Sequence, residues 1–160
     1  MENKLITDKP ITIIGVGDGA IQILCHIGSE CKGNVSFIMY NTNVEPLECS
    51  KDLGNDDEKV IVVSCLGGDC GNSTAPVVVR EARKLGKNIM AILTLPFSLE
   101  GSSKLEKALE SAKEIESIAD MTIMIQNQYF MDNYGKQPII EAYRKADEII
   151  CRMINQIIMI

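Results

Sequence analysis

The sequence predicts an α/β protein built on a parallel, doubly wound sheet. Two observations lead to this fold class. Short apolar, β-branched runs alternate with segments of helical periodicity, and three of these runs end at glycines or at an Asn-Thr turn. Strands that alternate with helices form parallel sheets, and burial on both faces makes such strands read as continuous apolar runs. With no linker-like stretch, the 160-residue chain is expected to be one domain, residues 1–160.

Five apolar runs are the predicted strands. The first, Ile-Thr-Ile-Ile-Gly-Val, is β-branched and ends in glycines, as expected of a buried strand. The second closes at the turn Asn41-Thr42-Asn43 and the third at Leu66-Gly67-Gly68. In chain order the predicted strands are Ile11–Val16, Val35–Tyr40, Val60–Ser64, Asn88–Leu95 and Met121–Ile125.

Segments of helical spacing separate the strands. Ala20–Glu30 is a predicted helix, and Asn72 or Ser73 is expected to cap the next one, which ends at Gly86. Lys51–Lys59 lacks periodicity and is predicted to be a polar loop.

Two more helices are predicted in the second half of the chain. Ser103 and Glu106 have the S-x-x-E spacing of a capping box, with an inner face formed by Leu105, Leu109 and Ala112. Pro138 opens a long last helix whose apolar side carries Ile139, Tyr143, Ala146, Ile150, Met153 and Ile157.

Composition and charge exclude several function classes. The formal net charge is −6 and the pI is about 4.8, so neither nucleic acid nor an acidic membrane surface is an expected partner. No run reaches the roughly 18 apolar residues of a membrane span, and Met1–Pro10 lacks the apolar core of a secretory signal. We therefore expect a cytoplasmic protein.

The six cysteines are expected to be reduced and structural. Cys25, Cys65 and Cys151 fall within apolar periodic segments, where cysteine behaves as a small buried hydrophobe. The chain has no CxxC pair, and its single histidine, His26, directly follows Cys25, so no metal site built by the protein is predicted.

The predicted ligand site lies at the carboxyl ends of the strands, where doubly wound sheets bind their ligands. The segments that follow the strands there are Gly17-Asp18-Gly19, Asn41-Thr42-Asn43, Gly67–Ser73 and Pro96–Gly101. Two of these loops are rich in glycine and lead into helix starts, where backbone N–H groups and the helix dipole favour an anion.

Taken in order, these segments resemble the FtsZ/tubulin family of GTPases. LGGDCGNSTAP resembles the family's GGGTGTG signature loop, and LPFSLEG is similar to its Pro-Phe-x-x-Glu-Gly loop. The resemblance covers nearly all of residues 11–157 and implies a Rossmann-like nucleotide-binding domain without the family's C-terminal domain, with a role in cell division. The matching segments are Ile14–Gly19, Val35–Asn43, Leu66–Pro76, Leu95–Gly101, Asn127 and Pro138–Ile150.

The resemblance also implies a role for each site residue. GTP or GDP is the implied ligand, with Glu100 and Asn127 at the ribose and Asn127 also at the base. Tyr143 and Asp147 are expected to hold the guanine. The backbone amides near Gly17, Gly19, Gly67, Gly68 and Gly71 are expected to face the phosphates, and the same loops contribute Asp18, Asn72, Ser73 and Pro96.

The guanine pair also has a physical rationale of its own. Tyr143 and Asp147 are four residues apart on a predicted helix, so they project from one face. A carboxylate can accept hydrogen bonds from N1–H and N2–H of guanine together, whereas adenine offers no such pair of donors. The alternative is that Tyr143 belongs to the core and Asp147 is a solvated charge.

Departures from the family pattern predict little or no GTP hydrolysis. Asp18 and Asp69 stand where the family has glycines, and a carboxylate ~5 Å from a phosphate charge costs on the order of 3 kcal/mol at an effective dielectric near 20. A bridging Mg²⁺ would offset this cost. The stretch Val44–Lys59 is expected to be too short for a helix and strand with a γ-phosphate loop. The chain also ends at Ile160, before the family's catalytic loop.

Two further expectations concern association and alternative functions. The last residues, Met153–Ile160, are apolar on more than one side, and this predicts a homo-oligomer, most simply a dimer, through the C-terminal helix. Another FtsZ-like protein is an alternative partner. A pseudo-GTPase interaction module that binds no nucleotide is the alternative function, and Cys70 as a nucleophile near a helix start is a minor third reading.

Overall fold

The computed structural model describes residues 11–28, 35–54, 59–126, 128, 132 and 139–158. Its centre is a five-stranded sheet in the order β2-β1-β3-β4-β5, and every neighbouring pair is parallel. The strands are β1 (Ile11–Val16), β2 (Val35–Tyr40), β3 (Lys59–Cys65), β4 (Asn88–Leu95) and β5 (Met121–Gln126). The chain order reverses at β1, because β2 lies on one side of it and β3 on the other.

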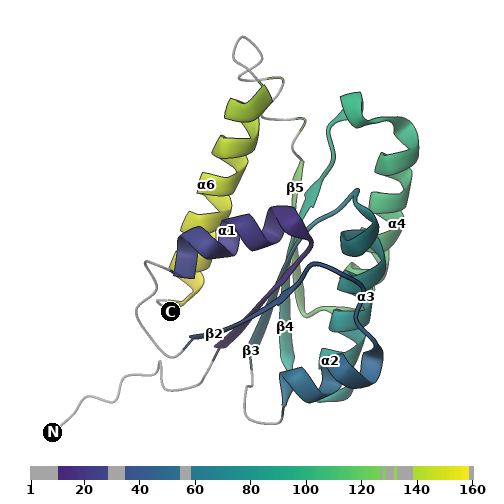
Figure 1. Cartoon of the computed structure of the whole chain (residues 1–160), viewed down its shortest axis with the longest axis vertical. Helices are drawn as coiled ribbons and strands as arrows, with labels where there is room; N and C mark the ends of the chain where they lie inside the picture. Colours follow the sequence, from purple (N-terminus) through teal and green to yellow (C-terminus); the bar gives the residue numbers. More distant parts are fainter. Residues whose placement is uncertain are drawn as a thin grey trace, which may run out of the picture.

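Helices cover both faces of this sheet (Figure 1). One face carries α1 (Asp18–Gly28) and α6 (Ile139–Ile158), and the other carries α2 (Pro46–Leu53), α3 (Asp69–Lys84) and α4 (Ser102–Ile118), with the short 3₁₀ turn η1 (Ser98–Glu100) before α4. The parallel, doubly wound fold class predicted from the sequence is therefore confirmed.

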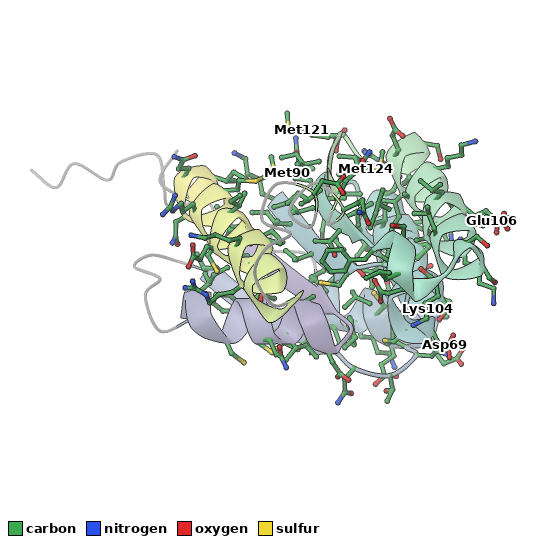
Figure 2. All side chains as sticks on the ribbon, turned by 90° about the horizontal axis from the view of Figure 1, so that it is seen from above. Asp69, Met90, Lys104, Glu106, Met121 and Met124 are labelled. Atoms are coloured by element: carbon green, nitrogen blue, oxygen red, sulfur yellow. The ribbon has the colours of Figure 1, made fainter. Side chains whose placement is uncertain are left out.

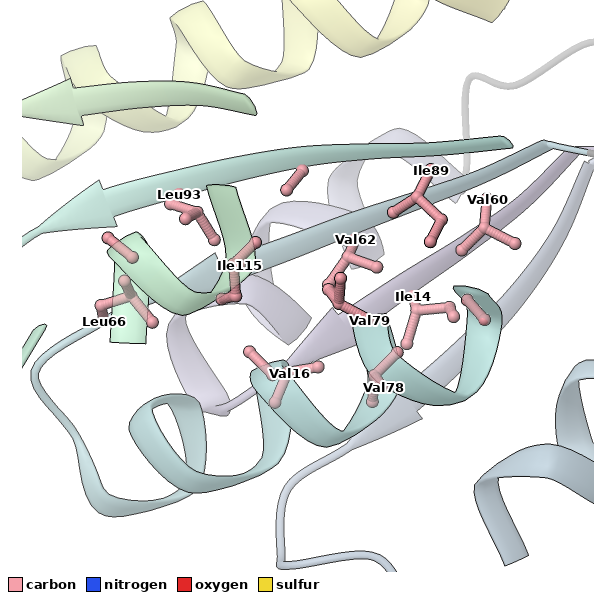
Figure 3. Packing of buried hydrophobic residues seen from close by; sticks show 14 of the residues in the cluster. Ile14, Val16, Val60, Val62, Leu66, Val78, Val79, Ile89, Leu93 and Ile115 are labelled. Atoms are coloured by element: carbon pink, nitrogen blue, oxygen red, sulfur yellow. The ribbon is translucent and has the colours of Figure 1, made fainter. Parts of the chain in front are cut away.

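Alternating strand residues divide the core into two clusters. On the α1 and α6 side, Ile13, Ile61 and Ile92 pack with Ile150 and Ile154 of α6. On the other side the strands pack against α3 and α4, as Figure 3 shows for a cluster that includes Ile14, Val16, Val60, Val62, Val78, Val79, Ile89, Leu93 and Ile115. Burial on both faces explains why these strands read as unbroken apolar runs.

The predicted strand bounds agree with the structure more closely than the predicted helix starts. β1, β2 and β4 have the predicted bounds, and β3 and β5 differ by one residue at their ends. The prediction that Asn72 or Ser73 caps the second helix is wrong, because α3 begins at Asp69 with Gly68 as its N-cap. An aspartate in the first turn favours this earlier start through the helix dipole.

The predicted start of α4 is also wrong. α4 begins at Ser102, and no side-chain cap closes it, so the Ser103–Glu106 capping box does not form. The capping carboxylate belongs to the preceding turn, where Phe97 N–H donates to Glu100 Oε2 at 2.7 Å. Leu109, expected on the inner face, is exposed, and Ala108, Ser111, Ala112 and Ile115 are the buried residues of the helix.

The stretch between β2 and β3 contains a helix that the sequence reading missed. α2 starts with Pro46 and buries Cys49 and Leu53, although residues from Lys51 onward were expected to form a loop. The Tyr40 hydroxyl donates to Asp52 Oδ2 at 2.6 Å, and burial raises the pKa of the Cys49 thiol to about 11. Two buried side chains in eight residues are too weak a periodic signal to recognise in advance.

The described cysteines differ in exposure. Cys25 is exposed, contrary to expectation, while Cys65 and Cys151 are partly buried. None of the described helices has the length and hydropathy needed to cross a membrane.

α6 buries Ile150 and Ile154 against the chain's own core, so part of the apolar surface expected at a dimer contact is already covered.

Candidate functional site

A cavity of about 410 Å³ opens at the carboxyl ends of β3 and β4, beside the point where the strand order reverses. This is the position at which doubly wound sheets bind ligands, and the volume is in the range of small-molecule sites. Six of the predicted site residues line it: Gly19, Gly67, Gly68, Pro96, Glu100 and Asp147. The other lining residues are Gln22, Cys65, Leu66, Thr94, Lys104 and Ala146.

Two of the predicted phosphate-facing amides already have acceptors within the chain. Gly17 N–H donates to the Tyr40 carbonyl at 2.8 Å, and Gly67 N–H donates to Asn72 Oδ1 at 3.0 Å. Both glycines have positive φ, 92° and 114°, which side-chain-bearing residues rarely adopt. These two glycines therefore shape the loops, and their amides are committed to the loops' own hydrogen bonds.

The remaining glycines differ in how tightly they are packed. A Cβ on Gly71 would lie 2.8 Å from the Cys65 carbonyl oxygen, and one on Gly19 would lie 2.9 Å from Cys65 Sγ. A Cβ on Gly68 would meet nothing within 4 Å. Gly71 is thus required for the packing of α3 on β3, whereas Gly68 faces open space at the cavity.

The two acidic replacements begin the two helices that border the glycine loops. Asp18 is the first residue of α1 and Asp69 is the first of α3, and both are exposed. Neither lines the cavity. A carboxylate at a helix N-terminus is stabilised by the dipole that would otherwise favour a phosphate.

Polar side chains tie the start of α3 to the end of β2. The hydroxyls of Ser73 and Thr74 both donate to Asn43 Oδ1, at 2.8 and 3.0 Å. Asn72 accepts from Gly67, so the predicted site residues Asn72 and Ser73 hold the loops in place and are not among the lining residues. Cys70, expected in a loop, lies in the first turn of α3, with its thiol 3.7 Å from the Tyr40 carbonyl.

The opposite side of the cavity is built from side chains on η1, α4 and α6. Glu100 holds the turn through its bond to Phe97 N–H, and Phe97 is fully buried against Ala146 of α6. Lys104, in the first turn of α4, lines the same cavity as Asp147. A cation and two carboxylates therefore line one space.

The floor of the cavity contains a thiol. Burial raises the pKa of Cys65, although a hydrogen bond with Thr94 opposes this, and the charge of Asp147 raises it further. Both Cys65 and Thr94 line the cavity. Cys65 is therefore a neutral group at neutral pH and contributes shape, not charge.

Two predicted residues cannot be placed and six lining residues were missed. Asn127 and the side chain of Tyr143 lie outside the described residues. The missed residues are Gln22, Cys65, Leu66, Thr94, Lys104 and Ala146. Helical spacing could have indicated one of them, because Gln22 follows the predicted residue Gly19 by three positions along α1.

Within the described part of the chain, no group of three or more His, Cys, Asp or Glu side chains is arranged to hold a metal ion. Mg²⁺ usually binds one or two carboxylates together with substrate phosphates. The carboxylates that line the cavity, Glu100 and Asp147, fit only that mode of Mg²⁺ binding.

Comparisons with known proteins agree with this geometry. The family model described as "Tubulin/FtsZ family, GTPase domain" matches residues 48–135. Cell division protein FtsZ 1 of Halobacterium salinarum is 35% identical over 100 residues, which are 62% of this chain and 25% of that protein. The chain spans between a quarter and a half of the length of the curated relatives it matches first.

Solved structures show the same fold. FtsZ from M. jannaschii superposes with a TM-score of 0.80 at 21% identity, covering 95% of this chain and 57% of that one. CetZ2 from Haloferax volcanii gives 0.70 at 17% identity, covering 93% and 58%. The FtsZ-type fold expected from the sequence is thereby confirmed. Because the family match takes in more than half of its residues, this chain belongs to the Tubulin/FtsZ family, through that family's GTPase domain.

Proposed function

We propose that this chain binds a guanine nucleotide, GTP or GDP, in the cavity beside β3 and β4, and hydrolyses it little or not at all. The observation that carries the proposal is that one cavity of about 410 Å³ is lined by residues of four family-like segments. These segments are the first glycine loop, the signature loop, the Pro96–Gly101 loop and the last helix.

Asp147 supports guanine as the base. Its carboxylate lines the cavity from α6, where it can accept from both N1–H and N2–H of guanine. Glu100, fixed by Phe97 N–H, would face the ribose, and Tyr143 and Asn127 remain predicted contacts to the base. Lys104 is the cation of the described lining residues and would oppose the phosphate charge.

Low hydrolysis follows from the glycine side of the cavity. The amides of Gly17 and Gly67 donate within the chain, so fewer donors are free to stabilise a terminal phosphate. Asp18 and Asp69 add negative charge at the two helix starts that would otherwise attract it. A Mg²⁺ ion held by Asp18 or Asp69 together with a nucleotide would supply positive charge that offsets part of that repulsion.

Titration calorimetry with GTP and GDP, with and without Mg²⁺, tests the proposal. We expect saturable binding that Asp147→Ala reduces at least tenfold. Glu148→Ala is the matched control, because Glu148 is the next residue of α6, pairs with Arg144 and does not line the cavity. Absence of heat with every nucleotide, or equal effects of the two variants, contradicts nucleotide recognition by this site.

The second candidate is a pseudo-GTPase interaction module that binds no nucleotide. The same committed amides and the two aspartates favour it. Thermal denaturation distinguishes the two candidates: a nucleotide that binds the folded chain should raise its unfolding temperature as the nucleotide concentration rises. An unfolding temperature that stays unchanged at every GTP and GDP concentration favours the module.

Self-association in the cytoplasm, within cell division, is the biological role that the relatives suggest. The curated relatives are named cell division proteins, and CetZ2 was solved as a GTPγS-bound protofilament. The partner would be a second copy or another FtsZ-like protein. The dimer predicted through the C-terminal helix would use outward residues such as Ile149, since Ile150 and Ile154 pack inward. Light scattering that shows a monomer at high micromolar concentration contradicts this role.

A further inference from the structure

We infer that the free edge of β5 is a self-association surface, on which the β5 strand of a second copy pairs in antiparallel orientation. The inference rests on the self-association proposed above and names its surface. It places the contact on the sheet, whereas the sequence placed it on the C-terminal helix.

β5 is an edge strand without the usual protection. It is the last strand in the order and, among the described strands, pairs with β4 alone, so one row of its backbone N–H and C=O groups faces away from the sheet. Its six residues, MTIMIQ, contain no charge, proline or glycine. Natural edge strands are commonly blunted by lysine, proline or bulges, and an unprotected edge is a template for another strand.

Apolar side chains flank this edge on both faces of the sheet. Met121 is 53% exposed and Met124 is 40% exposed, and residues of odd separation in a strand point to opposite faces. Met90 is the β4 partner of Met121. Figure 2 shows Met90, Met121 and Met124 along one margin of the molecule. A strand added here would cover apolar surface on both faces as well as the backbone.

The other edge of the sheet is the weaker candidate. β2 has one exposed large apolar side chain among its six residues, Met39, with 40% exposure. The side chain of its last residue, Tyr40, donates a hydrogen bond to Asp52 of α2. β2 is therefore partly engaged by neighbouring elements, whereas the exposed methionines concentrate at β5.

A two-fold axis midway between the two copies of Ile123 makes β5 self-complementary. Directly opposed residues of an antiparallel pair lie on the same face, so an axis perpendicular to the sheet must pass midway between the two copies of one residue. With Ile123 opposite its own copy, Met121 faces Ile125 of the second copy and Thr122 faces Met124. Asp120, just before the strand, then faces Gln126, so no charge opposes a like charge. With Thr122 opposite its own copy, Asp120 would instead face a methionine.

Disulfide trapping tests this register. Opposed Cα atoms in antiparallel strands are about 4.5–5.5 Å apart, within the span of a disulfide. We expect Ile123→Cys to form a covalent dimer under mild oxidation, above the wild-type background of native cysteines, and non-reducing peptide mapping to show residue 123 linked to its own copy. Met124→Cys is the matched control, since residue 124 faces 122 and should not link to itself.

Charge at the edge gives an independent readout. Met121→Lys with Met124→Lys changes two exposed residues, so folding should persist, and we expect the dimer dissociation constant to rise at least tenfold in sedimentation equilibrium. Met39→Lys is the matched control, because Met39 has the same exposure as Met124 but lies on β2; this variant should leave the dimer dissociation constant unchanged.

The outcomes separate this inference from the broader proposal. If Ile149→Glu on α6 disrupts the dimer and the β5 variants do not, the surface is wrong while self-association stands. If the wild-type chain is monomeric at every concentration, both are wrong.

Discussion

The two sides of the cavity offer different groups to a ligand. On the glycine side the backbone is committed to the fold, because Gly17 and Gly67 donate within the chain and Gly71 packs against β3. On the opposite side, Lys104 and Asp147 present side chains to the cavity. A loop can therefore keep its glycines for packing and for hydrogen bonds within the chain while the charged groups of the cavity come from the other wall.

The aspartates sharpen this contrast. At the first positions of α1 and α3, a carboxylate stabilises the helix through the dipole and repels a phosphate through its charge. Fold stability and phosphate binding therefore have opposite requirements at Asp18 and Asp69. Four experiments test this contrast, and they follow in order of decreasing effect.

Replacing both aspartates tests the charge on the glycine side. Asp18→Gly with Asp69→Gly removes two negative charges from the helix starts. The repulsion of a phosphate by each, ~3 kcal/mol for a pair ~5 Å apart, is reduced by solvent because both carboxylates are exposed and do not line the cavity. We expect GTP to bind on the order of 100-fold more tightly in calorimetry. Asp18→Asn with Asp69→Asn is the control that removes charge but keeps side-chain volume. If neither variant binds GTP more tightly, the charges of Asp18 and Asp69 do not limit phosphate affinity.

Two glycine substitutions test the packing on that side. Gly71→Ala places a Cβ 2.8 Å from a carbonyl oxygen, and overpacking of this kind lowers the free energy of unfolding by about 1–3 kcal/mol. At Gly68 a Cβ meets open space, so Gly68→Ala should change the free energy of unfolding by less than about 1 kcal/mol. Urea denaturation measures both. Similar values for the two variants contradict the distinction between packed and open glycines.

Lys104 tests the side-chain wall. Lys104→Ala removes the cation that lines the cavity and should weaken GDP binding roughly tenfold, with a smaller salt dependence than the wild type. Lys107→Ala, on an exposed position of α4, is the matched control. A tenfold loss of GDP affinity in both variants would mean that the total positive charge of α4 matters, not the position of Lys104 in the cavity.

The smallest expected effect is on helix stability. Asp69→Ala removes the favourable charge in the first turn of α3 and should lower the free energy of unfolding by about 0.5 kcal/mol at low salt. Thermal denaturation at low and high salt checks this, because screening should shrink the difference. If Asp69→Ala is more stable than the wild type, the Asp69 carboxylate does not stabilise α3 through the helix dipole.

Sequence reasoning predicted the sheet well and the helix starts poorly. The strands were found because burial on both faces leaves an unbroken apolar run, as in Ile11–Val16. α2 was missed because only Cys49 and Leu53 of its eight residues are buried. The start of α3 was misplaced because Asn72 and Ser73, which look like caps, bind Gly67 and Asn43 instead.

The predicted site residues also fall into two groups, those that line the cavity and those that do not. Gly19, Gly67, Gly68, Pro96, Glu100 and Asp147 were predicted from motifs and line one cavity. Gly17, Asp18, Gly71, Asn72 and Ser73 were predicted with them and do not line it. A motif identifies the loop, but the choice between lining, packing and hydrogen bonding within the loop depends on distances between strands that no local pattern contains.

Local periodicity and motifs along the chain were enough to predict the alternation of strands and helices, the edge of the sheet where loops gather, and the family resemblance that the comparisons confirm. Two features required the folded chain: Lys104 and Cys65 line one cavity with Asp147, and β5 has an apolar outer edge. Those depend on contacts between residues far apart in the chain, which the packing of α6 and the order of the strands create.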